Sequence, residues 1–143
     1  MSLPHADVRV LIRKALDDHF VAHQDHAFFA GVEGRLSYCE GLQGWPLPYA
    51  VFFFVDTEPE DTFTERNDHV SIQISVWAQT AGEAEGLAAA AYDLFENQEL
   101  TADGLQSFRL QRDTPVPTMP ETDGETPLWQ SGICLAGLVQ TIS

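Results

Sequence analysis

Apolar residues repeat every three or four positions between residues 8 and 20, which is the spacing of one side of an α-helix. The remaining positions of this segment are mostly charged, as expected for a side that faces water. Asp7 lies at the start, where a negative charge complements the helix dipole. The apolar positions are Val8, Leu11, Ile12, Ala15, Leu16 and Phe20, joined on the same side by His19.

A second helix is predicted from Thr80 to about Glu96. Thr80 and Glu83 have the T-x-x-E spacing of a capping box, in which the two residues satisfy each other's free backbone donors. Apolar residues follow at helical spacing, and many of them are alanines, which allow a helix to lie close to a sheet. They are Ala84, Leu87, Ala88, Ala91, Leu94 and Phe95.

Strands are predicted over residues 35–38, 49–55, 69–78, 108–112 and 129–141. The run 49–55 is continuously apolar and rich in aromatic and β-branched residues, which favours a strand covered on both sides. Residues 69–78 alternate between apolar and polar positions, which is typical of a half-buried strand. Trp77 falls on the polar side of that strand, so this side is not simply wet.

These elements predict a single α+β domain over residues 1–143, with a mainly antiparallel sheet of four to five strands and two helices packed on one face. Residues 22–33 show no regular pattern. Two long loops are expected, an acidic one at about residues 56–68 and one with four prolines at about 114–128. Loops of this length in a domain are usually functional or disordered.

The net charge of the chain narrows the classes of function that it can have. The chain has 22 Asp and Glu against 7 Lys and Arg, giving a net charge of −15. Such a surface repels phosphate backbones and anionic lipids, so binding to nucleic acid or to a membrane surface is not expected. No apolar run reaches the length of a membrane-spanning helix, and the first residues lack the pattern of a signal peptide.

Candidate chemistry is sparse. His19, His23 and His26 would share one side of a helix that continued past residue 20, and three imidazoles can bind zinc. The helical pattern fades at Asp25, so a solvated or partly packed cluster is the better interpretation. Cys39 and Cys134 have no catalytic signature and are interpreted as buried, inert thiols.

Carboxylates are numerous, but they lie in polar loops, whereas an acid–base pair needs burial. They are interpreted as a solvated surface, and no catalytic, cofactor or metal residue is assigned. The loop carboxylates are Glu58, Glu60, Asp61, Glu121, Asp123 and Glu125.

The order of elements nevertheless resembles the tail-completion (tail terminator) proteins of long-tailed bacteriophages and prophages. The resemblance runs over nearly the whole chain and is carried by five features: the amphipathic first helix, Arg35-Leu36-Ser37-Tyr38, the approach Pro46-Leu47-Pro48-Tyr49, the strand ending in Val76-Trp77, and the junction Gly82-Glu83-Ala84-Glu85 into the Ala/Leu helix. The proline-rich segment 114–127 has no counterpart in the family pattern.

The resemblance implies a structural protein without catalytic activity or cofactor. Such proteins form a ring, typically a hexamer, on the end of the tail tube, stop its polymerisation and present a surface to the head connector. The implied partners are other copies of the chain, the tail tube protein and the neck connector protein. DNA passes through without specific binding. The implied location is the tail end of the virion at the neck, and the host cytoplasm during assembly.

Candidate interface residues follow from the acidic loop and the tryptophans. Exposed strand edges and long loops suit ring closure, because edges offer free backbone hydrogen-bonding groups. Tryptophans on polar strand faces are common interface anchors. The candidates are Glu58, Glu60, Asp61, Phe63, Arg66, Trp77 and Trp129.

Three alternatives stay open. The first is another small neck or head–tail joining ring protein. The second is an acidic module that captures a basic partner. The third is a small metal-binding enzyme that uses the histidine cluster.

Overall fold

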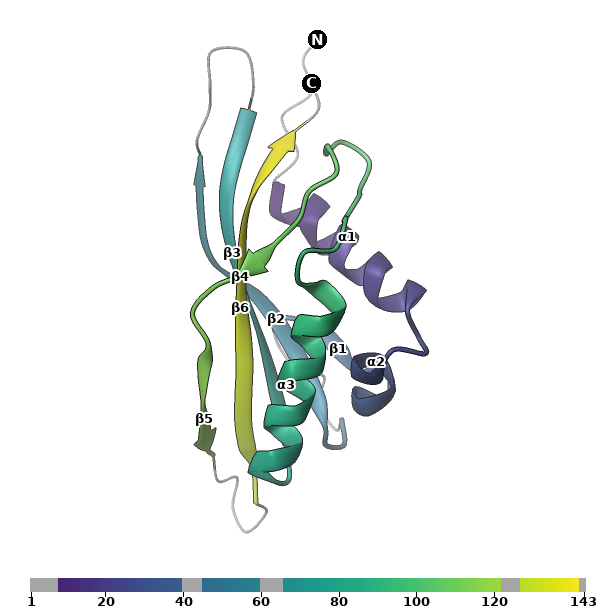
Figure 1. Cartoon of the computed structure of the whole chain (residues 1–143), viewed down its shortest axis with the longest axis vertical. Helices are drawn as coiled ribbons and strands as arrows, with labels where there is room; N and C mark the ends of the chain where they lie inside the picture. Colours follow the sequence, from purple (N-terminus) through teal and green to yellow (C-terminus); the bar gives the residue numbers. More distant parts are fainter. Residues whose placement is uncertain (1–7, 40–44, 60–65, 122–126, 142–143) are drawn as a thin grey trace.

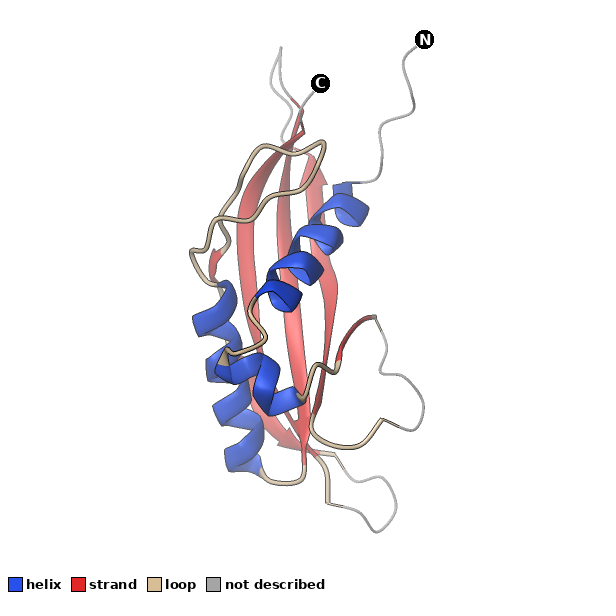
Figure 2. Cartoon of the chain, turned by 90° about the vertical axis from the view of Figure 1, so that its right-hand side faces the viewer, coloured by secondary structure: helices blue, strands red, loops and turns tan. Residues whose placement is uncertain are grey.

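One curved sheet carries all the helices on a single face, as Figures 1 and 2 show in two perpendicular views. The computed structural model describes residues 8–39, 45–59, 66–121 and 127–141. Their helices are α1 (Val8–Ala22), α2 (Ala27–Val32) and α3 (Ala81–Phe95), and their strands are β1 (Leu36–Tyr38), β2 (Tyr49–Pro59), β3 (Arg66–Ala78), β4 (Gln111–Arg112), β5 (Val116–Pro120) and β6 (Trp129–Thr141).

The sheet is mainly antiparallel, which confirms the predicted α+β class. Its strand order is β1-β2-β3-β6-β4, and β5 pairs with another part of β6. The long central pairs β2–β3 and β3–β6 are antiparallel, whereas β1 runs parallel to β2. The count differs from the prediction, because the described residues form six strands rather than four to five and three helices rather than two.

The core lies between the helices and one face of the sheet. Alternate residues of β3, Val70, Ile72, Ile74 and Val76, are almost fully buried against the helices. Successive side chains of a strand point to opposite faces, so this burial also identifies the face that the helices leave open. None of the described helices is both long and apolar enough to cross a membrane.

Both predicted helices form, and α3 begins as its cap predicts. The Thr80 hydroxyl accepts a hydrogen bond from the Glu83 backbone N–H at 3.1 Å. The prediction missed α2, which occupies part of the segment considered irregular. This helix has only six residues, too few to show a helical period. Its N-cap is His26, whose Nδ1 accepts a hydrogen bond from the Phe28 N–H at 3.0 Å.

Both predicted long loops are shorter than expected. Strand β2 continues to Pro59 and β3 begins at Arg66, because the two strands keep pairing past a bulge between Phe54 and Asp56. Within the second loop, β5 pairs with β6 from Val116 to Pro120. Conversely, the strand predicted over residues 108–112 is reduced to Gln111–Arg112, since Phe108 and Leu110 make only isolated bridges.

Candidate functional site

The helices leave one face of the sheet uncovered, and we call this surface the open face. Its positions are Tyr49, Val51, Phe53 and Val55 of β2, Ser71, Gln73, Ser75 and Trp77 of β3, and Gln130, Gly132, Cys134, Ala136 and Leu138 of β6. Val51, Ser75 and Gly132 are buried between their neighbours. The rows from Tyr49 to Phe53 carry no charged residue, whereas the register places Asp56 opposite Ser71 and Glu58 opposite His69 in the next two rows.

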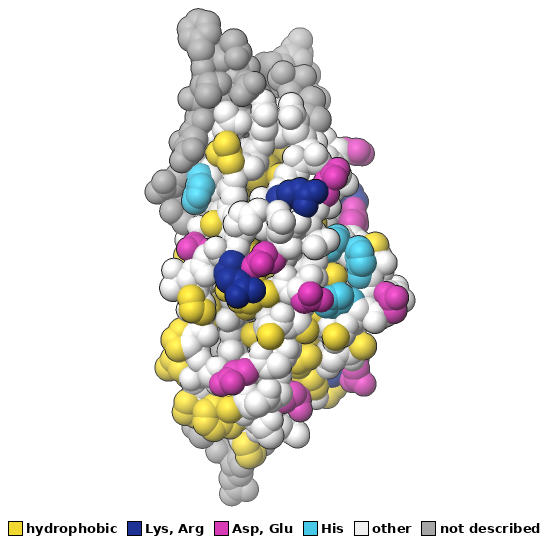
Figure 3. All heavy atoms as spheres, viewed as in Figure 1, with side chains coloured by type: hydrophobic (Ala, Val, Ile, Leu, Met, Phe, Trp, Pro, Cys, Tyr) yellow, Lys and Arg dark blue, Asp and Glu magenta, His cyan; other side chains and the backbone are white. Residues whose placement is uncertain are grey.

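Apolar side chains are exposed on and beside the open face. Val55 is 56 % exposed and Leu138 51 %, and Met119 of the adjoining β5 is 54 % exposed. Figure 3 shows apolar side chains gathered along the lower left margin, where β5 lies, while most acidic and histidine side chains in this view lie over the helices to the right. The sheet side of the molecule is therefore suited to contact with another apolar, uncharged surface.

Aromatic rings close one end of the open face. Trp77 stacks on Tyr49, with ring centroids 5.5 Å apart, and its Nε1 donates a hydrogen bond to the Glu121 carboxylate at 2.9 Å. Charged positions thus begin at the margins, at Glu121 and at Asp56, which is opposite Ser71 in the register. The expectation that this side of β3 is not simply wet is confirmed.

The two edges of the sheet differ. Strand β1 covers β2 only from Ala50 to Phe52, and no described strand pairs with the outer edge of β2 beyond that point. On the far side, β6 is paired in turn with β5, with β4 and with the segment around Leu105. The outer strand there, β5, contains Pro117 and Pro120, which lack the N–H that pairing requires.

Six of the seven Lys and Arg side chains have a partner within their own chain, and the side chain of the seventh, Arg66, is not among those that the structure describes. Lys14 pairs with Asp18 at 2.8 Å, and Arg112 pairs with Glu96 at 2.7 Å. The other contacts are Arg35 to Glu33 and the Pro48 carbonyl, Arg109 to Glu99 and the Asn97 carbonyl, Arg13 over the Tyr38 ring, and a further interaction of Arg9. Few positive charges therefore remain to receive a phosphate or a carboxylate from outside.

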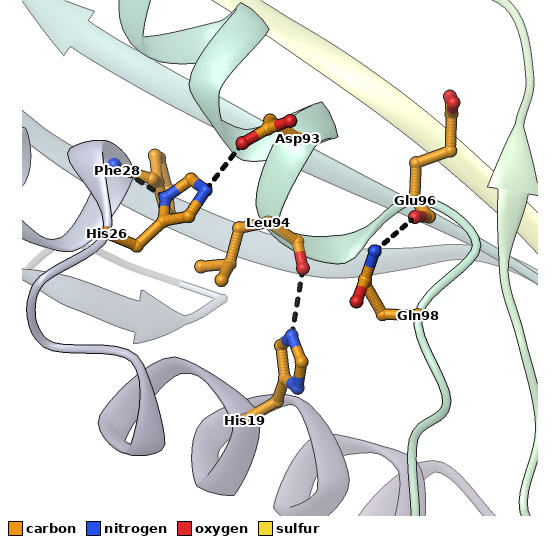
Figure 4. A network of polar contacts seen from close by, with 7 residues as sticks. All are labelled: His19, His26, Phe28, Asp93, Leu94, Glu96 and Gln98. Carbon is orange, nitrogen blue, oxygen red and sulfur yellow. Dashed lines mark hydrogen bonds and ion pairs between the residues drawn. The ribbon is translucent and has the colours of Figure 1, made fainter.

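His19 and His23 lie side by side, with ring centroids 4.3 Å apart, but α1 ends at Ala22, so His26 does not continue their helical row. Figure 4 shows His19 and His26 reaching α3 at separate points. His19 Nε2 donates to the Leu94 carbonyl at 2.8 Å, and His26 Nε2 contacts Asp93 at 2.8 Å. His23 instead bonds the His19 carbonyl through Nδ1. The imidazoles of His19 and His26 therefore fasten α1 and α2 to α3.

Within the described residues, no three His, Cys, Asp or Glu side chains are grouped to hold a metal ion. A depression of about 250 Å³ lies between α1 and residues 99–101, and it includes Asp18, His19 and Glu99. The Nε2 atom of His19 is already bonded to Leu94, and Asp18 is paired with Lys14. The depression therefore offers no poised acid–base pair.

The cysteines differ from each other. Cys39 is exposed at the end of β1, so its prediction as a buried thiol is wrong. It follows the last residue of a short edge strand, where little packs over it. Cys134 lies at the centre of the open face and is half-buried, and burial raises its pKa above the ordinary value. Its thiol is therefore kept protonated.

We expect His19 to make stability depend on pH. Burial lowers its pKa below the ordinary 6.5, although the bond to Leu94 acts in the opposite direction. The unfolded chain then binds more protons than the native state just below pH 6.5. The stability contribution is full above that value and is lost as pH falls through the lowered native pKa.

The measurement is denaturant unfolding across this pH window for the protein and for His19→Gln, whose amide can still donate to Leu94. The difference in unfolding free energy between the two proteins should shrink or change sign as the pH falls. Parallel pH profiles would contradict the assignment.

The predicted interface residues that the structure describes do not form one cluster. Trp77 lies on the open face, whereas Trp129 pairs in register with Ala78 and Pro120 and is half-buried. Glu58 and Arg66 occupy paired strand positions opposite His69 and Thr141. Glu60, Asp61 and Phe63 lie outside the described residues.

Sequence reasoning missed most of the open face, including Phe53, Gln73 and Leu138. The available signal was that the polar positions of 71–77 and the second side of 129–141 contain Ser, Gln, Gly, Ala and Cys but no charge. The signal was missed because the polar side of a predicted strand is ordinarily assigned to solvent, whether or not its polar residues are charged.

Comparisons place the chain among known proteins. Residues 23–117 match the family described as Tail completion protein gp17. A solved chain from the virion of a native gene transfer agent (GTA) particle is similar with a TM-score of 0.59 and 18 % identity, covering 90 % of this chain and 96 % of that chain. A second solved structure is similar with a TM-score of 0.57 and 20 % identity, and the match covers 94 % of this chain and 97 % of that chain. No curated protein matches in sequence. At these identities the structural likeness shows a shared fold.

Proposed function

The chain belongs to the tail completion protein gp17 family, and from this we propose that it forms a ring on the end of a phage tail tube. The family match over residues 23–117 is the observation that carries the proposal. It confirms the resemblance found in the sequence, and it makes the chain a structural component of a phage or phage-like virion. The proposed ring stops tube polymerisation and offers the head connector a joining surface.

The negative net charge of the chain supports passage of DNA through the ring without specific binding. DNA-binding surfaces neutralise phosphates with Lys and Arg, and the released counterions supply much of the affinity. This chain has a net charge of −15, and cations such as Lys14 and Arg112 are paired with carboxylates of the same chain. A ring of such subunits repels the DNA that moves through it.

The role proposed is structural rather than catalytic. The features that the described residues form serve packing: histidines that fasten helices together, and a strand edge of β2 that β1 covers only in part. The proposal requires partners of three kinds, which are further copies of the chain, the tube protein and the connector protein. No cofactor enters it.

The test is the mass of the purified protein in dilute solution by light scattering, with negative-stain images of the same sample. Rings, alone or on added tail tubes of the parent phage, are the expected result. A monomer that neither forms rings nor caps tubes would overturn the proposal. Rings that bind the connector but never the tube would favour the alternative of a different neck protein.

A further inference from the structure

We propose that Trp77 and Glu121, at one end of the open face, form a docking site for an arginine side chain of a basic partner protein. The proposed function enters only in taking that partner to be another protein of the virion. The site itself follows from strand register, ring stacking and charge, and none of these depends on whether the chain forms a ring.

Trp77 belongs to a row of side chains that crosses four strands. The row consists of Tyr49 of β2, Trp77 of β3, Gln130 of β6 and Met119 of β5, which follow one another in register. Residues in register on neighbouring strands share one face of a sheet, so all four side chains project from the open face. Glu121 comes two residues after Met119, and its backbone N–H donates to the Leu128 carbonyl at 2.7 Å. The carboxylate is thereby held at the end of this row.

Trp77 joins an aromatic surface to that carboxylate. Its ring stacks on Tyr49, with centroids 5.5 Å apart and an interplanar angle of 20°. Its Nε1 donates to the Glu121 carboxylate at 2.9 Å, which keeps the charge beside the indole. A guanidinium is planar and carries five N–H donors, so it can stack on an aromatic ring and pair with a carboxylate at the same time. Trp77 and Glu121 offer both of these contacts.

An arginine of this chain already fills the same combination elsewhere. Arg112 lies over the Tyr92 ring, with its Cζ 4.2 Å from the ring centroid, and its Nε pairs with Glu96 at 2.7 Å. Among the described side chains, no Lys or Arg lies over Trp77 or pairs with Glu121. This ring and carboxylate can therefore receive an arginine from another molecule.

The charge of the chain indicates which kind of molecule supplies it. Asp and Glu outnumber Lys and Arg by 22 to 7, and six of the seven cations already have partners in their own chain. An arginine of a second copy would have to leave such a contact, whereas a protein rich in basic residues has cations to spare. The net charge of −15 also attracts a basic protein. A basic protein other than this chain is therefore the occupant that fits.

The test adds the capped tripeptide Gly-Arg-Gly to isotope-labelled protein and follows the tryptophan indole N–H signals by NMR. We expect a saturable shift of the Trp77 signal, which is assigned by its loss in Trp77→Phe. Trp129 is the internal reference, because it precedes Gln130 and so points to the other face of β6. A peptide with citrulline in place of arginine has no charge and should leave Trp77 unmoved. A lysine peptide should bind about threefold more weakly or worse, because an ammonium does not stack as a guanidinium does.

The matched variants are Glu121→Gln and Asp103→Asn. The glutamine amide can still accept the Trp77 hydrogen bond, so Glu121→Gln removes only the charge of the site. Asp103 is exposed in the loop between α3 and β4, at the other end of the molecule from β5 (Figure 1), and its variant loses the same charge. We expect Glu121→Gln to weaken binding of the arginine peptide about fivefold, and Asp103→Asn to bind it like the unmodified protein. Thermal melting checks that both variants fold.

The possible results separate this inference from the proposed ring. An unmoved Trp77 signal, equal weakening by the two variants, or equally tight binding of the citrulline or lysine peptide would overturn the inference. Loss of self-association in Glu121→Gln, measured by light scattering, would make a second copy the occupant and would also overturn it. A protein that binds the arginine peptide at Trp77 but neither forms rings nor caps tubes would support the inference and overturn the ring.

Discussion

Replacing Phe28 with alanine is expected to lower the free energy of unfolding by about 3–5 kcal/mol. Phe28 is fully buried, and its ring makes edge contacts with Phe20 at 5.7 Å and Phe95 at 6.1 Å. It therefore joins α2 to α1 and α3, and its removal leaves a cavity where three helices meet. Native domains are stable by only about 5–15 kcal/mol, so much of that stability would be lost.

Denaturant unfolding followed by circular dichroism measures the change. The control is Val21→Ala on the exposed side of α1, where Val21 is 55 % exposed. A substitution there should change stability by no more than about 0.5 kcal/mol. If Phe28→Ala were as mild as this control, the assigned core would be wrong.

Adding a single methyl group at Gly132 is expected to destabilise the protein by about 1–3 kcal/mol. A Cβ atom there would lie 2.6 Å from the Ile74 carbonyl oxygen and 3.3 Å from Val116 Cβ. The first of these neighbours is backbone of the central strand β3, which cannot turn aside as a flexible side chain would. Gly132→Ala must therefore shift β6 relative to β3, and thermal and denaturant unfolding would both register the loss.

Gly86→Ala makes the same chemical change with the opposite expected sign. Gly86 lies within α3 with nothing inside 4 Å of an added Cβ, and glycine in a helix interior costs about 0.8–1.0 kcal/mol relative to alanine. The helix substitution should thus stabilise the protein while the strand substitution destabilises it. Equal signs for the two variants would contradict the strand packing described here.

The fold was largely predictable where apolar residues repeat over many positions. The period of α1, the cap and period of α3 and the alternation of β3 all gave the right element. Failures occurred where tertiary pairing decides the outcome. Residues 56–59 are polar and acidic, yet they extend β2 because β3 lies beside them. Helix α2 is too short to show a period, and its cap is a histidine, an uncommon capping residue.

The candidate surface was less predictable, for a physical reason. A strand's polar side is assigned to solvent by default, and only the arrangement of three strands shows that Phe53, Gln73 and Cys134 are neighbours. Trp77 alone signalled that this side is unusual. The histidine spacing alone could not show how each imidazole is held, because the helix along which it was projected ends at Ala22.

The prolines of β5 have a consequence for how far this sheet can grow. An outer strand with complete backbone donors is a template for further strands, which is how proteins are recruited into fibres. Pro117 and Pro120 interrupt that template on the β5 side, whereas the opposite side ends in the open edge of β2. The sheet is therefore extensible in one direction only. Pairing between the backbones of two copies can therefore join two β2 edges, but further strands are not added through β5.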